Sequence, residues 1–487
     1  MKWNSKFRIQ AWLVFPFILF VLILSSCTSS PSTPTATVVT PAIPDGAWMA
    51  PTDVYSSTQP NYLELGWQSF IAFNWPAVTG AKTYPGQPDK SMNITNPAAA
   101  KLPTVWLTWM MPAQVFLDRA KNPGTWETPA VSLPVKKDPT TGKMLPVIGG
   151  LNKPAAREPD YDPDFDQASS NSPLIDQQDK YVVYDVRMNE SEFTYLSLTE
   201  YYNAQKQIND VKAGGFKPFP KTGKDLPSPA MPTTLNDWAQ FGATEIKASW
   251  RILVDGKDDF SRYYTMRAYV ALPDGTTGGP YTLGLVGFHI LRLTPSTGST
   301  WFWATFEQVD NLDAPTDHTA SFNNGSTADC QKEGYSYQPT PIYYATPLPQ
   351  NLPVNVCRVT PIPATVAALN ASYQKKLTGT LWQYYQMVNT LNPMPGGPCA
   401  LTDPPLSGAA MNTCDMVNVT IETYTQVNTQ CNSCHQFGFP KGVLELTPQP
   451  PDLGKLQIFT FLLGHAQDPN STNFRIKLPI IPTPTSP

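Results

Sequence analysis

The residues at 431–435 form the motif Cys431-Asn432-Ser433-Cys434-His435 near the C-terminal end of the 487-residue chain. Two thiols three residues apart can form thioethers with the two vinyl groups of haem, and the adjacent imidazole can ligate the iron. This spacing places all three groups on one turn of the chain. The motif therefore predicts one covalently bound haem c, held by Cys431 and Cys434, with His435 as the proximal iron ligand.

Two other chemistries use the same residue types. The pair Cys431 and Cys434 could be a thiol redox centre, or it could bind zinc together with His435 and one more ligand. Thiol redox chemistry does not require the histidine that follows. The chain has no second Cys-x-x-Cys motif and no closely spaced pair of histidines to complete a zinc site. The motif therefore favours haem.

The sixth iron ligand is left open by the sequence. No methionine follows residue 416, and His465 is the only histidine downstream of the motif. It ends residues 452–465, whose apolar residues have helical spacing and could cover a haem edge. His465 is thus the favoured distal ligand, although it could instead be a surface histidine. Met394, upstream of the motif, and an open coordination position are the alternatives.

The motif resembles the haem attachment site of c-type cytochromes, and other phrases extend the resemblance. Residues 66–72, 245–251 and 305–311 resemble a poorly characterised family of exported bacterial c-type-cytochrome-like lipoproteins with a single Cys-x-x-Cys-His motif. The resemblance covers roughly residues 60 to 470. It implies haem binding, and it implies no substrate.

The N-terminal residues have the three parts of an export signal. Lys2, Lys6 and Arg8 precede an apolar run over residues 11–24, which is short for a membrane span of about 30 Å. The small residues before Cys27 resemble a bacterial lipobox, which implies a signal peptide over residues 1–26 and a lipid on Cys27. Ordinary cleavage that leaves a thiol is the alternative. We expect residues 27–60 to be a Ser/Thr/Pro-rich tether on the extracytoplasmic side of the cell envelope, in the outer membrane or periplasm of a Gram-negative cell.

Seven cysteines are present, and three of them are used by the predicted lipid and haem sites. Outside the cytoplasm the other four are expected to be oxidised. Their order suggests the disulfides Cys330 with Cys357 and Cys399 with Cys414. Other pairings of these four cysteines stay open.

Composition sets the class of protein. The formal net charge is −4, so the mildly acidic chain is predicted not to bind nucleic acid. Apolar residues make up 41% and aromatic residues 11%, which excludes wholesale disorder. The 52 prolines limit long helices and indicate many ordered loops.

Hydrophobic periodicity predicts an α+β fold, in which helices pack on an antiparallel β-sheet body and a mainly helical haem segment follows. The expected strands are residues 181–187, 244–254, 262–272, 281–293 and 299–309, the last four linked by hairpins. The expected helical stretches are residues 61–75, 103–117, 191–212 and 364–390. The predicted parts are an α+β domain over 61–360, a haem segment over 361–470 and a Pro-rich tail over 471–487.

The strand pattern also suggests a second site. Lys247, Arg251, His289 and Glu307 fall on polar strand faces, and Trp301 and Trp303 share the face of Glu307. They could line a small-ligand or haem-facing pocket. The simpler interpretation, which we favour, is that the charged faces are solvated and that His289 is a satisfied core residue.

These patterns lead to a functional hypothesis with two alternatives. The favoured function is a membrane-anchored monohaem c-type cytochrome that carries single electrons to or from a redox partner protein. The first alternative is a haem-dependent oxidoreductase, peroxidase-like or oxidising a small molecule, with an open iron position near His289, Arg251 or Glu307. The second is a binding or sensor module that contains haem.

Overall fold

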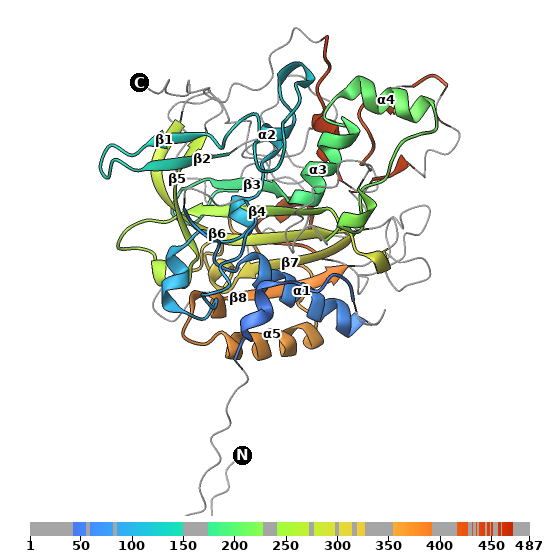
Figure 1. Ribbon diagram of the computed structural model, residues 1–487. Helices are drawn as coiled ribbons and strands as arrows, with labels where there is room; N and C mark the ends of the chain where they lie inside the picture. The colour runs from blue at the N-terminus through green and yellow to red at the C-terminus, as the bar shows by residue number, and fades with distance from the viewer. Residues whose placement is uncertain are drawn as a thin grey trace, which may run out of the picture. The chain divides into compact units, whose positions relative to one another are not determined.

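A large β-sheet is the central element of the structure, which is a computed structural model of the chain (Figure 1). All statements below concern the residues that the structure describes. These are residues 42–54, 59–80, 85–149, 174–226, 241–271, 277–297, 301–313, 319–326, 354–391, 416–426, 431, 435, 438–443, 446–448, 450, 456–458 and 460–470.

The sheet has eight strands in the order β1-β2-β5-β6-β4-β3, with β7 next to β6 and β8 next to β7. Their bounds are β1 Val135–Lys137, β2 Met144–Ile148, β3 Val182–Met188, β4 Thr244–Ile252, β5 Thr265–Ala271, β6 Thr277–Arg292, β7 Phe302–Gln308 and β8 Tyr385–Leu391. All pairs of neighbours are antiparallel except β2 with β5. The α+β class is confirmed, and the sheet is mixed rather than purely antiparallel.

The long strand β6 organises the sheet because it pairs with three other strands. Its first half pairs with β5, its second half pairs with β7, and β4 runs along the opposite edge. The predicted hairpins β5–β6 and β6–β7 are therefore formed. The predicted pairing of β4 with β5 is wrong. Strand β6 lies between these two strands, and β4 pairs with β6 and β3.

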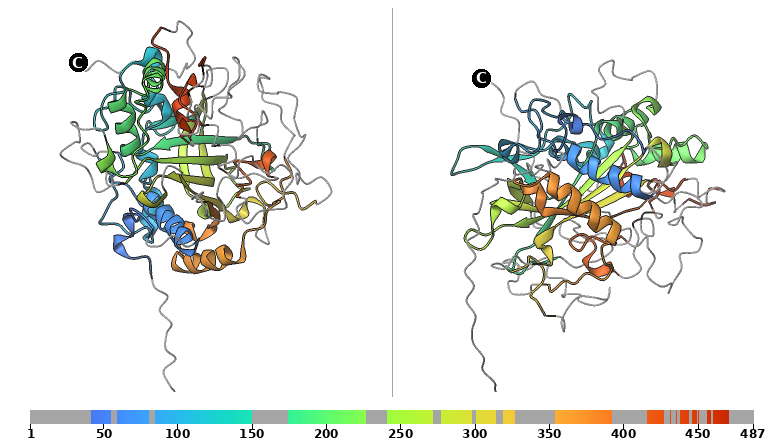
Figure 2. Two further views of the ribbon diagram at one scale, coloured as in Figure 1. Left: turned by 90° about the vertical axis from the view of Figure 1, so that its right-hand side faces the viewer. Right: turned by 90° about the horizontal axis from the view of Figure 1, so that it is seen from below.

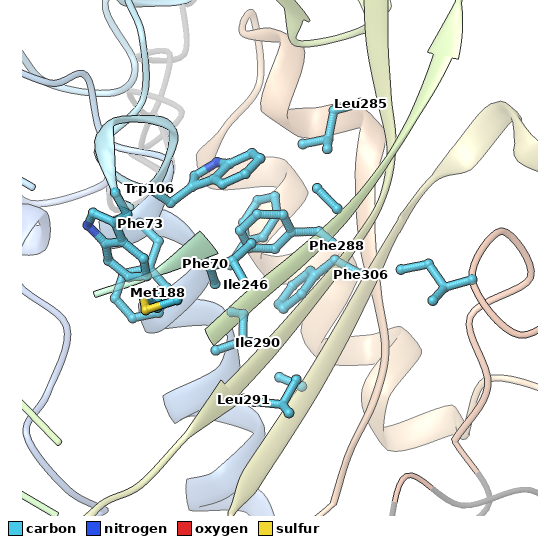
Figure 3. Close-up of a cluster of buried hydrophobic side chains, with 14 of the residues drawn as sticks. Phe70, Phe73, Trp106, Met188, Ile246, Leu285, Phe288, Ile290, Leu291 and Phe306 are labelled. Atoms are coloured by element: carbon cyan, nitrogen blue, oxygen red, sulfur yellow. The ribbon is translucent and has the colours of Figure 1, made fainter. Parts of the chain in front are cut away.

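Two helices cover one face of the sheet. Helix α1, Gln59–Phe73, and helix α5, Ala364–Lys376, run side by side across β8 (Figure 2, right). The ring of Trp67 in α1 stacks on Tyr373 of α5 at 4.8 Å, and its Nε1 donates to Oδ1 of Asn370 at 3.0 Å. Phe70 packs onto Phe306 of β7 at 4.3 Å, in the aromatic core shown in Figure 3.

Short capped helices follow β3. Helix α3, Glu190–Thr199, begins at Asn189, whose side chain accepts from the backbone N–H of Glu192. It ends at Glu200, which has a φ of 60°. Helix α4, Ala204–Lys212, begins at Asn203, which caps it in the same way. The single helix predicted over residues 191–212 is therefore two helices, because Glu200 and Asn203 end one and start the next. Within residues 103–117, the short helix α2, Pro112–Val115, starts at the proline expected to interrupt it.

The helix predicted over residues 364–390 is wrong in its second half. Helix α5 ends at Lys376, and Gly379 has a φ of +86°, which a helix interior does not allow. A 3₁₀ turn, Leu381–Tyr384, then leads into β8. Strand β8 is buried against β7, so its apolar side chains serve the sheet rather than a helix.

The C-terminal part of the predicted haem segment, residues 361–470, is also less helical than expected. Residues 456–458 and 460–470 contain the 3₁₀ helix Leu462–His465 and no α-helix, so the helix predicted over residues 452–465 is wrong within that described part. Proline-rich flanks and Gly464 disfavour a longer helix there. Among all described residues, no helix is long and apolar enough to cross a bilayer.

Candidate functional site

The two described residues of the Cys-x-x-Cys-His motif are both helical. Cys431 and His435 are four residues apart, a spacing at which two residues of an α-helix share a face. Cys431 is half-buried and packs against the main hydrophobic core. Cys434, the other predicted attachment point, lies outside the described residues. The described part of the motif thus consists of a cysteine and a histidine at helical spacing.

His435 lies between two aromatic rings. Its ring centroid is 5.1 Å from that of Phe461 and 5.9 Å from that of Trp303, whose plane is inclined by 70°. Trp303 belongs to β7 and is buried, while His435 is half-buried. The polar strand face that carries Trp303, Thr305 and Glu307 therefore faces the motif.

Residues 416–426, here called the covering segment, lie on the same sheet face just before the motif. Asn418 donates from Nδ2 to Oγ1 of Thr305 and to the carbonyl of Phe306, both at 2.9 Å. The backbone N–H of Val419 donates to Oε1 of Glu307 at 2.7 Å. These contacts tie the chain before Cys431 to strand β7, although more than a hundred residues separate the two in the sequence.

Close approach to β6 allows this segment to lie flat. The hydroxyls of Ser249 and Thr420 are 2.6 Å apart above Gly287. A Cβ atom at Gly287 would overlap both hydroxyl oxygens and Oδ1 of Asn418. The absence of a side chain at this position of β6 is therefore required by the covering segment.

A side-chain hydrogen bond fastens the next turn of the covering segment to β6. Nε2 of His289 lies 2.9 Å and 3.1 Å from the two carboxylate oxygens of Glu422. The same carboxylate accepts from the backbone N–H of Asn418 at 3.0 Å. His289 is thus a satisfied residue at Nε2 and helps to hold the segment that leads into the motif.

Two other residues of the suggested polar pocket are likewise engaged inside the protein. Arg251 pairs with Asp176 at 2.5 Å and with Asp258 at 2.7 Å, and it is 2% exposed. Glu307 is 0% exposed and pairs with Arg358. The expectation that this charged face is solvated is wrong at these two positions. Their charges are used in ion pairs within the fold, and the ammonium of Lys247 lies over the ring of Tyr184.

His465, the favoured distal ligand, ends the 3₁₀ helix Leu462–His465. Its ring packs against Phe116 at a centroid distance of 5.8 Å. Burial, together with the positive charge of Lys441, lowers the pKa of His465 to about 4. The imidazole is therefore neutral at pH 7, the form in which a histidine ligates a metal.

The segment that carries His465 is held by α4 and by Trp301, the residue just before β7. Oε1 of Gln207 accepts from the N–H of Lys441 at 2.7 Å, and Nζ of Lys441 donates to the carbonyl of Ala466 at 2.7 Å. Nε1 of Trp301 donates to the carbonyl of Ile458 at 2.7 Å. His435 contacts Phe461, which lies four residues before His465 in the sequence, whereas His465 itself packs on Phe116.

The donor chemistry of these residues fits a covalently attached haem. Cys431 supplies a sulfur, His435 an imidazole four residues later, and Trp303 and Phe461 the apolar surface that a porphyrin needs. Within the described residues, no group of three or more His, Cys, Asp or Glu side chains could hold a metal ion by itself.

Several predicted residues lie outside the described part of the chain. They are Cys27, Cys330, Met394, Cys399, Cys414 and Cys434. Cys357 is disulfide-bonded, as expected for an oxidised cysteine, and its predicted partner is among those residues. The pairing itself stays a prediction.

Sequence reasoning missed the residues that position the motif. Glu422, Asn418 and Phe461 act through contacts with residues far away in the sequence, and no local spacing reveals such contacts. Gly287 offered the only signal, as an isolated glycine inside a strand pattern, which marks a close backbone approach.

Comparison of the whole chain with models of protein families, with curated proteins and with solved structures finds no match.

Proposed function

We propose that the protein is an extracytoplasmic, lipid-anchored monohaem c-type cytochrome that carries single electrons. The observation that carries the proposal is that Cys431 and His435, four residues apart, both have helical backbone, and that the ring of His435 contacts those of Trp303 and Phe461. A bound haem would supply a one-electron iron centre. The chain would supply its attachment, its axial ligand and an apolar surrounding.

Each residue has a separate role in this proposal. Cys431 and Cys434 hold the macrocycle, and His435 is the proximal ligand. His465, neutral and buried nearby, is the favoured distal ligand, with Met394 or an open position as alternatives. Cys27 anchors the chain to the envelope through its lipid, and a redox partner protein delivers or accepts the electron.

The alternative of a haem oxidoreductase gains no support from the polar residues once assigned to it. Arg251 and Glu307 are committed to ion pairs with Asp176, Asp258 and Arg358, so they are not free to act on a substrate. One observation favours an open iron position. His435 packs on Phe461 and His465 packs on Phe116, so the two imidazoles have different ring neighbours. Binding of carbon monoxide or cyanide by the reduced or oxidised protein distinguishes the two functions.

The decisive test is chemical. The mature full-length protein, made in a host with c-type cytochrome maturation, is expected to give a haemochrome spectrum in alkaline pyridine and a mass increased by one haem after denaturation. The Cys431→Ala variant is expected to retain a single thioether, and Cys431→Ala combined with Cys434→Ala to lose covalent haem. Wild-type protein of unmodified mass under these conditions would overturn the proposal.

A third function, a binding or sensor module containing haem, makes a different prediction. It requires tight ligand binding without electron transfer, which persists in a His435→Ala variant that still folds. Stoichiometric oxidation and reduction of the wild-type protein by small one-electron mediators, with no substrate consumed, would support the electron carrier instead.

A further inference from the structure

Helix α4 and the loop that follows it carry an excess of lysines. Residues 204–226 contain five lysines and two acidic residues, whereas the whole chain has a net charge of −4. The lysines are Lys206, Lys212, Lys217, Lys221 and Lys224. This stretch is therefore opposite in charge to the chain as a whole.

Four of these lysines form no ion pair with any described residue. They are Lys212, Lys217, Lys221 and Lys224, here called the lysine surface. Three of them are exposed, and Lys221 is half-buried. The lysine surface thus offers several positive charges to a molecule that approaches from solvent.

The neighbouring acidic residues do not cancel this charge. The carboxylate of Asp210 pairs with Lys206 at 2.6 Å, and Oδ2 of Asp225 accepts from two backbone N–H groups at 2.8 Å and 3.1 Å. Glu200 precedes α4, and Lys441 is bound to α4 through its backbone N–H. With these two residues included, six lysines stand against three acidic residues, a net charge of +3.

Helix α4 packs directly on the segment that follows the motif. Nε2 of Gln207 donates to the carbonyl of Leu463 at 3.3 Å. The backbone N–H of Ala204 donates to the carbonyl of Gln467 at 3.0 Å. The lysine surface therefore belongs to the same part of the fold as the segment that carries His465.

A series of hydrogen bonds joins the motif to Trp301. The backbone N–H of Gly438 donates to the carbonyl of His435 at 2.9 Å, and the N–H of Ile458 donates to the carbonyl of Gly438 at 2.9 Å. Nε1 of Trp301 donates in turn to the carbonyl of Ile458 at 2.7 Å. The predicted proximal ligand is thus connected to a buried indole by three consecutive hydrogen bonds.

Aromatic rings continue from Trp301 to the lysine surface. The ring centroid of Phe219 lies 5.6 Å from that of Trp301 and 4.5 Å from that of Tyr195. The hydroxyl of Tyr195 donates to the carbonyl of Lys217 at 2.7 Å, and the N–H of Lys217 donates to the hydroxyl of Tyr201 at 3.0 Å. Lys217 is therefore the solvent end of a continuous path of contacts that begins at the motif.

We propose that the lysine surface is the docking site for an acidic redox partner protein. The electron transfer made at this site rests on the proposed function, in which a partner protein delivers or accepts the electron. Opposite charges steer the encounter of two proteins and fix their orientation. Interfaces between electron-transfer partners are small, so a few exposed lysines are sufficient. One electron would leave the haem iron, which is oxidised, and would reduce the docked partner beside Lys217.

Binding of an acidic polymer tests the surface without haem. The full-length mature protein is expected to bind fluorescent poly-L-glutamate at low ionic strength, and less tightly as salt screens the charges. The double variant Lys217→Glu with Lys224→Glu is expected to lose about tenfold or more in affinity, because the reversed charges repel the polymer.

The matched control is the double variant Lys137→Glu with Lys143→Glu. It reverses two exposed lysines in the hairpin of β1 and β2, which pairs with β5 and not with the strands that contact the motif. Its affinity for poly-L-glutamate is expected to stay within about twofold of that of the wild type. Equal losses in the two double variants, or no loss in Lys217→Glu with Lys224→Glu, would overturn the proposal.

Electron exchange with reagents of opposite charge tests the same surface in the haem protein. The reduced protein passes one electron to hexacyanoferrate(III), an anionic oxidant, or to tris(phenanthroline)cobalt(III), a cationic one. Relative to the control, Lys217→Glu with Lys224→Glu is expected to react about tenfold more slowly with the anionic oxidant and faster with the cationic one. Stopped-flow absorbance measures both rates. An equal ratio of the two rates in both double variants would overturn the proposal.

These outcomes separate the inference from the proposed function. Protein that lacks covalent haem but binds poly-L-glutamate through these lysines would end the cytochrome proposal and leave the docking surface in place. Haem-loaded protein in which the two double variants behave alike would leave the cytochrome proposal intact and overturn the docking surface. Loss of binding to phosphatidylglycerol vesicles in Lys217→Glu with Lys224→Glu, with unchanged oxidation rates, would assign the lysines to a lipid surface and overturn the proposal.

Discussion

Nε2 of His289 in β6 lies 2.9 Å from Oε1 of Glu422, across 133 residues of sequence. This contact joins the central strand of the sheet to the covering segment, nine residues before Cys431. Oε2 of the same carboxylate accepts from the N–H of Asn418, so one side chain fixes both the local turn and its position on the sheet. The placement of the motif thus depends on polar contacts as well as on apolar packing.

Replacing Glu422 by alanine is expected to lower the free energy of unfolding by about 2 kcal/mol, because a charged hydrogen-bond acceptor and its two contacts are lost. Chemical denaturation of purified protein measures this change. Asp313→Ala, which removes an exposed acidic residue, is the control and is expected to change stability by less than about 0.5 kcal/mol. A double-mutant cycle with His289→Gln isolates the contact, and additive effects of the two changes would show that the contact does not contribute.

Adding a single methyl group at Gly287 is expected to disturb the covering segment. The new Cβ in Gly287→Ala would overlap hydroxyl oxygens of Thr420 and Ser249, and overpacking of this kind costs about 1–3 kcal/mol. Gly46→Ala is the matched control, since nothing lies within 4 Å of a Cβ at that position. Thermal unfolding compares the two variants. Equal melting temperatures for Gly287→Ala and wild type would contradict the close approach.

The strands were predictable from the sequence because their pattern is local. Alternation of polar and apolar residues located β3 to β7 and assigned Ile246 and Trp250 to the core face, opposite Lys247 and Arg251. Strand β8 was missed because it is buried and follows a real helix, so its apolar residues continue a helical pattern. The three-way pairing of β6 could not be foreseen, since each pairing joins segments that are distant in the sequence.

The candidate site was predictable only in its chemistry. The spacing of Cys431, Cys434 and His435 predicts a cofactor type, and the sequence also predicted an aromatic strand face around Trp303 that could lie toward the motif. What the spacing could not give is which charged residues form ion pairs with one another. Arg251 and Glu307 looked available or solvated, whereas Asp176 and Arg358 neutralise them inside the fold.

Substitution of His465 tests the distal ligand. If two imidazoles hold the iron, His465→Met is expected to raise the reduction potential, since a thioether ligand stabilises reduced iron relative to imidazole. His465→Ala is expected to open the distal position, which carbon monoxide would then occupy in the reduced protein. Optical spectra and equilibrium redox titration measure both effects. Spectra and potential identical to wild type in both variants would exclude His465 and leave Met394 or an open position.

Stability of the apoprotein should depend on pH through Glu192. Burial and Glu245 raise the pKa of Glu192 in the folded state above its value of about 4.3 in the unfolded chain, so between these two values the folded state binds more protons. The contribution of this group to the free energy of unfolding is then fully present below its pKa in the unfolded chain. That contribution is lost as pH rises through its pKa in the folded protein. Relative to wild type, Glu192→Gln is expected to become progressively more stable as pH rises across this window, because glutamine does not titrate. Denaturant unfolding of the two apoproteins at several pH values measures the difference, with Glu200→Gln as control. A stability difference that stays constant with pH would mean that Glu192 is ionised in the folded protein.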